Sequence, residues 1–579
     1  MILQFPSSVA TLIVAGVLLG LYLAYRAVLP KPIPGIPYNK NAASKIFGDA
    51  PEMMDYVKRT GRVFCWLTSM TVRHRSPIIQ AFIKPMSRPW VVVTDPFESQ
   101  DILLRRTKEF DRSNMFGDLI NGILPEQHIQ FLSTDARFKD NRNLINHLMA
   151  PTFVNQISAP EVYKSVCTLI KVWQVKCDVA QGRPFSADHD IVYGALDSIF
   201  ASSFGLSEDD SITLPRLDAI SSWTPEIPDD IDTPVPFPDG VIPRIFQAVG
   251  TLADLVTSTQ SSPVPRLTSW VLRQFPYMKK AAVIKDQFIR DKVDESLRLM
   301  KSGDDRPRSA IHSVLLRERE VAAKHGRPPA YHGRAIADEF FGFMMAGNDT
   351  TATTVSWGVK FLTNNQAVQD RLRAKLHAAI PQAAQEKRAP TYQELIKAHV
   401  PYLDAVVEEV LRHANTIAFV ARVAVQDTMV LGYRIPKGTD VFFMANGAGY
   451  LEPNMAVDEA VRSPGARHYG GDGKVLTGAW DDGDVAEFKP ERWLVLDPET
   501  GTEVFDPLAG PTLAFGLGPR GCFGRKLAVQ ALRIQFAMTI WYFHLLEIPP
   551  ELNGYGAVQK FAREPTQCYL RLRSAMEES

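Results

Sequence analysis

The sequence predicts a mostly helical fold with a small β region, preceded by one helix that is apolar throughout. Apolar side chains recur at helical spacing in two long stretches, residues 335–362 and 525–543. Two short apolar runs, residues 78–82 and 90–94, flank a turn and predict a pair of strands. Residues 2–25 carry no charged side chain. Helices therefore dominate the expected fold, and its strands are few and short.

The composition narrows the class of function. The 579 residues include 64 Lys and Arg and 64 Asp and Glu, so the formal net charge is zero. A neutral chain lacks the basic surface that nucleic acid attracts, and we expect no nucleic-acid partner. The five cysteines are widely spaced and follow neither a disulfide nor a zinc pattern, which suits a reducing compartment. No HExxH, GxSxG or P-loop pattern occurs, so nothing favours a hydrolase or a kinase.

Residues 1–29 are predicted to form a transmembrane anchor. As a helix, residues 2–25 would be about 36 Å long, enough to cross a hydrocarbon core of about 30 Å. A cleaved signal peptide is the alternative, but it begins with a basic segment and has a shorter apolar core. Basic residues follow the apolar span, so the positive-inside rule places the rest of the chain in the cytosol. Residues 30–50 are expected to be a proline-rich linker, which is stiff and extended.

The region after the linker has a mixed pattern. Residues 52–58 and 96–106 predict helices, the second with a proline near its start. Residues 110–132 look like a loop. Residues 133–134, Ser and Thr, predict the start of the helix that follows.

The middle of the chain alternates core and surface segments. Apolar residues within 162–173 mark one face of an amphipathic core helix. Residues 225–265 are rich in proline, aspartate and serine without a steady period, and they predict a long surface excursion. The glycine-rich residues 470–483 are likewise expected at the surface.

The stretch 335–362 is apolar on almost every side, which predicts a deeply buried helix. Its centre nevertheless reads AGNDTT, residues 346–351. A glycine alone costs a helix about 1 kcal/mol, and polar residues that break the rules of a core usually mark function. Thr350 can donate its hydroxyl hydrogen to the carbonyl oxygen of Ala346, one turn back, and so bend the helix. A threonine-rich kink without a function is the alternative.

Cys522 stands in the glycine-rich segment 515–524, FGLGPRGCFG, directly before a predicted helix. The unpaired N–H groups and the dipole at a helix start favour negative charge, and Arg520 adds a positive charge. We therefore expect the Cys522 thiol to have a lowered pKa. Two alternatives remain. The cysteine could be a buried structural residue, and residues 516–521 also spell the dinucleotide pattern GxGxxG, which needs a following βαβ unit.

The spacing of five residues in this segment resembles FxxGxRxCxG, the haem-ligand loop of the cytochrome P-450 family. The resemblance spans nearly the whole chain and implies the cytochrome P-450 fold, with residues 51–579 as a single large haem domain. It implies that the Cys522 thiolate ligates the iron of haem b. It also implies that Arg520 binds a haem propionate, Gly518 allows a tight turn, Gly524 leaves room for the porphyrin and Phe515 shields the sulfur from water.

The resemblance predicts further contacts to the haem propionates. Family members usually have Trp-x-x-x-Arg where this chain has Phe138 and Arg142. Arg142 is therefore expected to pair with a propionate, whereas Phe138 keeps the ring and lacks the N–H donor. Arg422 is a candidate for a second propionate contact.

Residues 346–351 resemble the AGxDTT oxygen-activation motif of the family. The motif implies that Ala346 and Gly347 leave space for dioxygen and that Asp349 and Thr350 relay protons to it. By the same resemblance, residues 110–132 overlie the distal face of the haem. The expected substrate pocket is apolar, and its candidate residues are Phe341, Met344, Met345, Ala346, Ile417 and Phe419.

Glu409 and Arg412 are three residues apart and share one face of a predicted helix. Such a pair is usually solvated, but it matches the ExxR pattern of the family, and Arg492 matches its third partner. We assign the expected buried cluster of these three residues to folding and haem retention.

The resemblance implies a haem-thiolate monooxygenase, most similar to filamentous-fungal biosynthetic enzymes, that inserts one oxygen atom from dioxygen into a hydrophobic small molecule. Electrons are expected from NADPH through a reductase with FAD and FMN that docks on Lys139, Arg525 and Lys526, with cytochrome b5 as a second donor. The expected location is the endoplasmic reticulum membrane, with a single span and a cytosolic haem domain. The alternatives are a thiolate-haem isomerase or dehydratase, a haem sensor, and a membrane-tethered NAD(P)-binding oxidoreductase using residues 516–521.

Overall fold

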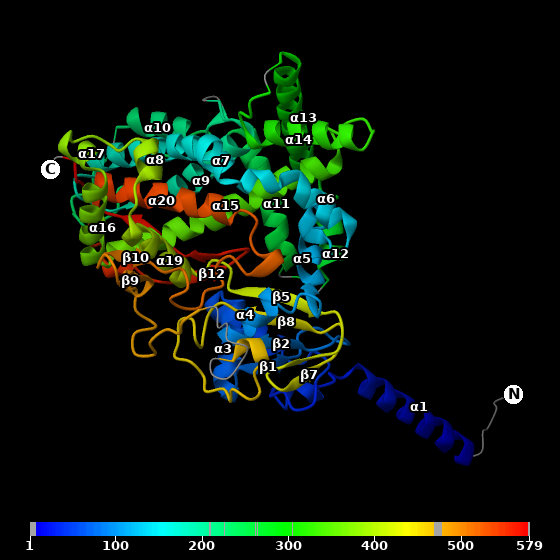
Figure 1. Cartoon of the computed structure of the whole chain (residues 1–579). Coiled ribbons are helices and arrows are strands. Elements are labelled where there is room, and N and C mark those ends of the chain that lie inside the picture. The colour runs from blue at the N-terminus through cyan, green and yellow to red at the C-terminus, as the bar shows by residue number, and fades with distance from the viewer. Residues whose placement is uncertain are drawn as a thin grey trace. The chain divides into compact units, whose positions relative to one another are not determined.

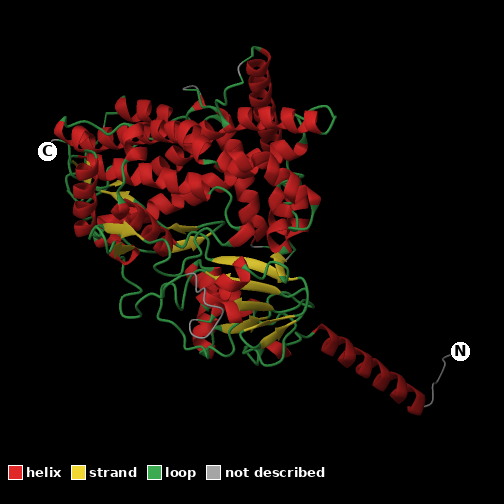
Figure 2. Cartoon of the chain, in the orientation of Figure 1, coloured by secondary structure: helices red, strands yellow, loops and turns green. Residues whose placement is uncertain are grey.

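The computed structural model describes residues 7–207, 210–224, 226–260, 262, 264–303, 305–467 and 477–576. Its contacts divide the chain into two units. The first comprises Met1–Ser113 and Phe419–Leu476, and the second comprises Asn114–Ala418 and Thr477–Ser579. The largest sheet belongs to the first unit, and helices make up most of the second (Figure 1; Figure 2). The expected helical fold with a small β region is confirmed.

The first unit is built on a five-stranded sheet with the order β1-β2-β8-β5-β3. The predicted strand pair is confirmed, because β1 and β2 are antiparallel with Ile78 opposite Val93. Strand β8 is parallel to β2 and antiparallel to β5. The strands of this unit are β1 (Ile78–Ala81), β2 (Trp90–Val93), β3 (Phe110–Arg112), β5 (Phe419–Ala424), β6 (Thr428–Val430), β7 (Tyr433–Ile435) and β8 (Asp440–Met444).

Both helices predicted in this unit are confirmed, as α2 (Ala50–Thr60) and α4 (Pro96–Leu104). A further helix, α3 (Val63–His74), lies between them in the sequence. The first turn of α4 is fixed by Asp95, whose side chain accepts a hydrogen bond from the Glu98 backbone N–H at 2.7 Å. Proline directly after this cap suits the first helical position.

Helix α1 (Ser7–Val28) contains a window, Thr11–Val28, that is long and apolar enough to cross a membrane. Its mean hydropathy is 1.8, and none of it is buried. This helix is compatible with membrane anchoring. The proline-rich run that follows is tied to the sheet, because Gln80 of β1 donates to the carbonyl oxygens of Ile33 and Ile36 at 2.8 Å.

In the second unit, the long helix α15 (Arg334–Thr363) contacts α9, α19 and α20. Twenty of the residues of α15 are buried, as its apolar composition predicted. The other helices are α5 (Asn114–Ile120), α6 (Ala136–Ile145), α7 (Pro151–Phe153), α8 (Ala159–Ala180), α9 (Asp188–Phe204), α10 (Thr213–Ser221), α11 (Arg244–Gln260), α12 (Pro265–Leu272), α13 (Pro276–Lys301), α14 (Ala310–Lys324), α16 (Gln366–Ala379), α17 (Pro381–Gln385), α18 (Tyr392–Lys397), α19 (Pro401–Ala414) and α20 (Arg525–Tyr542).

Short strands complete the second unit and pair antiparallel in twos. They are β4 (Phe185–Ser186), β9 (Leu494–Leu496), β10 (Glu503–Phe505), β11 (Phe543–Leu545), β12 (Ala557–Gln559), β13 (Arg563–Pro565), β14 (Tyr569–Leu570) and β15 (Leu572–Ser574).

Three local predictions are wrong. Residues 110–132 are not one loop, because they contain β3, α5 and a short 3₁₀ turn at His128–Gln130. Helix α6 is capped by Asp135, which accepts from the Arg137 N–H at 2.9 Å, and not by residues 133–134. Residues 225–265 include α11, whose apolar face is buried.

The expected surface segment 470–483 lies partly outside the described residues. In its described part, Trp480 is buried and its indole N–H donates to the Pro511 carbonyl oxygen at 3.1 Å. Trp480 therefore contributes to the core, whereas Gly478, Ala479 and residues 481–483 are exposed, as expected for a surface segment.

Candidate active site

Cys522 lies between a 3₁₀ turn, Gly518–Arg520, and the start of α20. Its backbone N–H donates to the Phe515 carbonyl oxygen at 2.7 Å, which closes the loop on itself. Gly516 and Gly518 have φ values of 60° and 69°, a left-handed conformation that glycine adopts without strain. Cys522 is exposed at the head of the helix.

The expected lowered pKa of the Cys522 thiol is wrong for the protein by itself. Although the residue is exposed, the protein packed around its sulfur raises the pKa of the thiol. The N–H groups of Gly524 and Arg525 and the positive charge of Arg142 act in the opposite direction, but burial outweighs them. A coordinated metal ion deprotonates a thiol outright, so this direction does not argue against iron ligation.

The centre of α15 differs from its ends. Ala346 is exposed, although most of the helix is buried. The Thr350 hydroxyl donates to the Ala346 carbonyl oxygen at 2.7 Å, as the sequence predicted. Thr354 repeats this bond to the Thr350 carbonyl oxygen, also at 2.7 Å. The two bonds hold a row of hydroxyl groups along the helix.

Gly347 allows α9 to pack closely against α15, and its expected role in leaving space for dioxygen stays a prediction. A Cβ atom at this position would lie 2.7 Å from Cδ1 of Ile199 on α9. The close approach of α9 therefore requires a glycine here. Its neighbour Ala346 is the exposed residue at this point of the helix.

Phe341 and Met344 are fully buried, with 0% exposure, and belong to the helical core. At 100° per residue they lie on the face of α15 opposite to Ala346 and Thr350. The structure thus places these two side chains in the helical core, and their role in a substrate pocket stays a prediction. Met345 is half-buried.

The sequence interpretation missed an aromatic contact that joins the cysteine loop to α15. The ring centroids of Phe343 and Phe523 are 6.3 Å apart. A Cβ atom at Gly524 would meet the Phe343 ring at 4.0 Å. Phe343 lies three residues before Ala346, so the helical period could have placed it on the same face.

Arg520 of this loop and Arg142 of α6, two of the arginines predicted to bind a propionate, lie close to aromatic rings in and near the loop. The Arg520 guanidinium is 4.1 Å from the centroid of the Phe138 ring, and it donates to the Phe131 carbonyl oxygen at 2.7 Å. The Arg142 guanidinium lies 4.9 Å from the Phe523 ring centroid. Burial lowers the pKa of Arg142, but an arginine remains charged.

The other predicted pocket and propionate residues lie at or beyond the boundary of this unit. Ile417 is half-buried. Phe419 and Arg422 are on β5 of the first unit, where the Phe419 ring centroid is 4.2 Å from that of Phe64. Arg422 is buried and donates to the Ala421 carbonyl oxygen at 2.9 Å. Their roles toward haem and substrate stay predictions.

Asp349 can exchange a proton near neutral pH. Its Oδ1 accepts from Asn348 Nδ2 at 2.8 Å. Burial, followed by the negative charge of Glu564 on β13, raises the pKa of Asp349 to about 6. Glu564 itself forms an ion pair with Lys560 at 2.8 Å.

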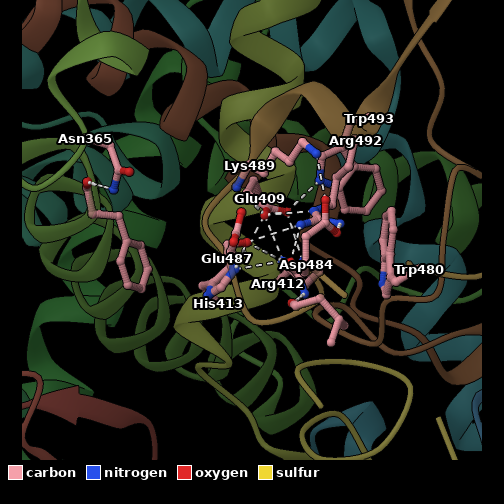
Figure 3. Close-up of polar contacts among 12 residues, drawn as sticks. Asn365, Glu409, Arg412, His413, Trp480, Asp484, Glu487, Lys489, Arg492 and Trp493 are labelled. Atoms are coloured by element: carbon pink, nitrogen blue, oxygen red, sulfur yellow. Dashed lines mark hydrogen bonds and ion pairs between the residues drawn. The ribbon is translucent and has the colours of Figure 1, made fainter. Parts of the chain in front are cut away.

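The carboxylate of Glu409 is the centre of a buried polar cluster on α19 (Figure 3). Arg412 donates to both of its oxygens, at 2.8 and 2.9 Å, and Arg492 donates to Oε1 at 3.1 Å. The side chains of all three residues are at most 6% exposed. The structure thus brings together the three residues that the sequence pattern grouped.

Further donors in this cluster were missed. The Trp493 indole N–H donates to Glu409 Oε2 at 2.9 Å, and the Lys489 backbone N–H donates to Oε1 at 2.8 Å. Asp484 accepts from Arg492 at 2.9 Å, which supplies a second negative charge. Trp493 directly follows Arg492, but nothing in the local sequence places Asp484 beside them.

This donor set fits a haem. It combines one exposed thiol at a helix head with two guanidinium groups and a helix that exposes Ala346. At Gly524 a Cβ atom would meet only one ring, so the surrounding protein does not itself require glycine there. The dinucleotide alternative fits poorly. Strand β11 after α20 pairs antiparallel with β15, whereas that fingerprint needs a parallel βαβ unit.

Comparison with known proteins identifies the family. The cytochrome P-450 family model matches residues 75–451. The cytochrome P-450 monooxygenase TRI13 of Fusarium sporotrichioides is 37% identical, over 96% of this chain and 97% of its own length. The cytochrome P-450 monooxygenase GME11363 of Pestalotiopsis microspora is 36% identical, over 98% and 99%. The cytochrome P-450 monooxygenase xilC of Penicillium rubens is 34% identical, over 97% and 95%.

The fold agrees with this assignment. The crystal structure of the cytochrome P450DA heme domain superposes with a TM-score of 0.65 at 16% identity, over 94% of this chain and 98% of that chain. A structural match at 16% identity supports the fold alone, whereas the relatives of nearly full length establish the family. This chain belongs to the cytochrome P-450 family.

Proposed function

We propose that the chain is a haem-thiolate monooxygenase that inserts one oxygen atom from dioxygen into a hydrophobic small molecule of fungal secondary metabolism. The observation that carries the proposal is the contact between Phe523, next to the exposed Cys522, and Phe343 on α15, because it joins the thiol loop to the helix of Ala346 and Thr350. Curated relatives of nearly full length are named as monooxygenases of the same family.

An isotope experiment tests this function. Membranes that contain the chain and a reductase are supplied with ¹⁸O₂, NADPH and a panel of apolar metabolites, first screened for a substrate-induced spin-state change. One ¹⁸O atom per product molecule is the expected result. A product that forms without dioxygen would instead identify an isomerase or a dehydratase.

The mechanism assigns a task to each group. The haem, when bound, supplies dioxygen binding and activation. Cys522 would hold the iron, and Arg142 and Arg520 would bind the propionates by charge-assisted hydrogen bonds. The Thr350 hydroxyl is a hydrogen-bonding group on the same face of α15 as Ala346. Asp349 takes up and releases protons one residue away.

Electrons come from a redox partner. We propose NADPH as their source and a reductase with FAD and FMN as the carrier, with cytochrome b5 as a second donor. The reductase is expected to dock on three exposed basic residues. Lys139 lies on α6, and Arg525 and Lys526 directly follow the cysteine loop. Their positive charges would attract an acidic partner.

Replacing Thr350 by alanine is expected to divert electrons from product to hydrogen peroxide. The variant loses the hydroxyl that bonds to the Ala346 carbonyl oxygen, and product formation should fall by roughly 10²-fold, within the range of positioned acid–base groups. Peroxide and product per NADPH are the quantities to measure. Thr350→Ser keeps the hydroxyl and should stay close to wild type. Equal coupling in both variants would remove Thr350 from the relay.

The yield of product per dioxygen is expected to fall as the pH rises through about 6, because Asp349 then loses its proton. Asp349→Asn should abolish this inflection, and Asp349→Glu should retain one.

The contribution of Asp349 to folding stability should also fall as the pH rises. A raised carboxyl pKa contributes stability fully below the unfolded value of about 3.9 and loses it as the pH rises through the folded pKa. An inflection that survives in Asp349→Asn would belong to another group.

Deleting residues 1–29 is expected to move the chain from the membrane pellet to the supernatant after ultracentrifugation, because α1 is the apolar span. We propose that this helix anchors the chain in the endoplasmic reticulum membrane with the haem domain in the cytosol. A chain with residues 11–28 scrambled keeps its hydropathy and should stay in the pellet. Retention of the truncated chain would indicate a second lipid-binding surface, such as residues 225–265.

A further inference from the structure

His128 lies in the short turn His128–Gln130 before α6, and it is fixed by a buried carboxylate. Its backbone N–H donates to Glu339 Oε1 at 2.6 Å, and its ring Nδ1 lies 2.7 Å from Glu339 Oε2. The Glu339 side chain is 2% exposed and also accepts from Asn141 Nδ2 at 3.0 Å. Three N–H groups therefore converge on one carboxylate of α15.

The two bonds to Glu339 determine which ring nitrogen of His128 can bind another group. A carboxylate accepts hydrogen bonds and cannot donate them, so the hydrogen of Nδ1 points to Glu339. Among the described residues, none forms a hydrogen bond with Nε2. The imidazole thus presents Nε2 on the side away from Glu339, where the doubly protonated form of the ring has a second N–H donor.

The ring of His128 lies among the groups assigned to the haem propionates. Its centroid is 6.2 Å from that of Phe138 and 6.2 Å from that of Phe523, the residue after Cys522. Arg520 lies over the first of these rings and Arg142 over the second. The three basic groups therefore share the two aromatic rings at the edge of the cysteine loop.

Phe138 cannot donate a hydrogen bond, although a tryptophan is usual at its position in the family. We propose that His128 supplies the missing donor. Held by Glu339, it donates from Nε2 to a haem propionate beside Arg142 and Arg520. This inference rests on the proposed haem-binding function and extends it to a positioning residue outside the known loop motif.

Two matched variants separate the two ring nitrogens. In His128→Asn the side-chain amide takes the place of Nδ1 and keeps the bond to Glu339, but nothing replaces Nε2. The purified holoprotein is mixed with an excess of apomyoglobin, and haem transfer is followed by absorbance. We expect transfer to become about tenfold faster, as for a lost hydrogen bond to a charged group.

The double variant His128→Asn with Phe138→Trp restores an N–H donor from α6. Its rate of haem transfer is expected to return to within about threefold of wild type. Rescue by a residue that does not touch Glu339 would distinguish propionate binding from a structural clamp. The thermal unfolding of the apoprotein should be the same in wild type and both variants, since the Glu339 bond is retained.

Two results would overturn the inference. They are an unchanged transfer rate in His128→Asn, and a faster rate that Phe138→Trp does not correct. Both results leave the proposed function intact, because the wild-type protein still carries haem. A wild-type protein that takes up no haem would instead overturn the proposed function itself.

Discussion

Replacing Cys522 by alanine is expected to abolish the red-shifted Soret band that the ferrous protein forms with carbon monoxide. That band requires thiolate ligation of the iron, and Cys522 is the exposed thiol at the head of α20. Turnover should fall to background in the same variant, because electron donation from sulfur favours O–O cleavage. Absorbance difference spectra of purified protein provide the measurement.

A second cysteine serves as the matched control. Cys177 on α8 is half-buried, and its Sγ lies 3.3 Å from the Leu572 carbonyl oxygen, so it carries a thiol without facing the loop. Cys177→Ala should keep the full band. A red-shifted band in Cys522→Ala would show that another residue ligates the iron. Segment 515–524 would then not be the haem-ligand loop.

Much of the fold could be predicted because its signals are local. Helix α15 follows from apolar residues on all sides, and α4 follows from a proline directly after an aspartate cap. Strand β3 gave no such signal. It is three residues long and exists because Phe110 pairs with Ala424, far along the chain. Helix α11 was obscured by the prolines and aspartates that precede it within 225–265.

The candidate site shows the same limit at the level of side chains. The motif named the residue types of segment 346–351, but composition could not tell which apolar side chains of α15 face the core. Phe341 is buried in the helical core, whereas Phe343 contacts the cysteine loop. The pKa of Cys522 depends on a competition between burial and the helix dipole, which only the packed structure decides.

Replacing Glu409 by glutamine is expected to destabilise the protein by roughly 3–5 kcal/mol, the cost of breaking a buried ion pair. The amide keeps the volume but leaves the guanidinium groups of Arg412 and Arg492 without their shared carboxylate. Thermal unfolding followed by circular dichroism should show a midpoint lower by roughly 2–4 °C, because the entropy of unfolding scales with chain length. Haem content after purification should fall with it.

Two comparisons make this result specific. Glu320→Gln removes an exposed pair with Arg317, at 3.3 Å with side chains 66% and 47% exposed, and should change the stability by less than about 0.5 kcal/mol. Adding Arg412→Met to Glu409→Gln should cost less than the sum of the two single changes, because the two residues bond to each other. Additive costs would mean that the pair contributes no coupling to the fold.

The pH dependence gives the same cluster an independent signature. Burial acts to raise the pKa of Glu409, but the hydrogen bonds from Arg412 and His413 outweigh it and hold the pKa well below its usual range. A depressed carboxyl pKa contributes stability that is complete above the unfolded value of about 4.3 and is lost as the pH falls toward the folded value. The stability gap between wild type and Glu409→Gln should therefore be constant from neutral pH down to about pH 5 and shrink in stronger acid. A gap that changes between pH 7 and pH 5 would contradict this assignment, because a carboxylate with a depressed pKa stays ionised throughout that range.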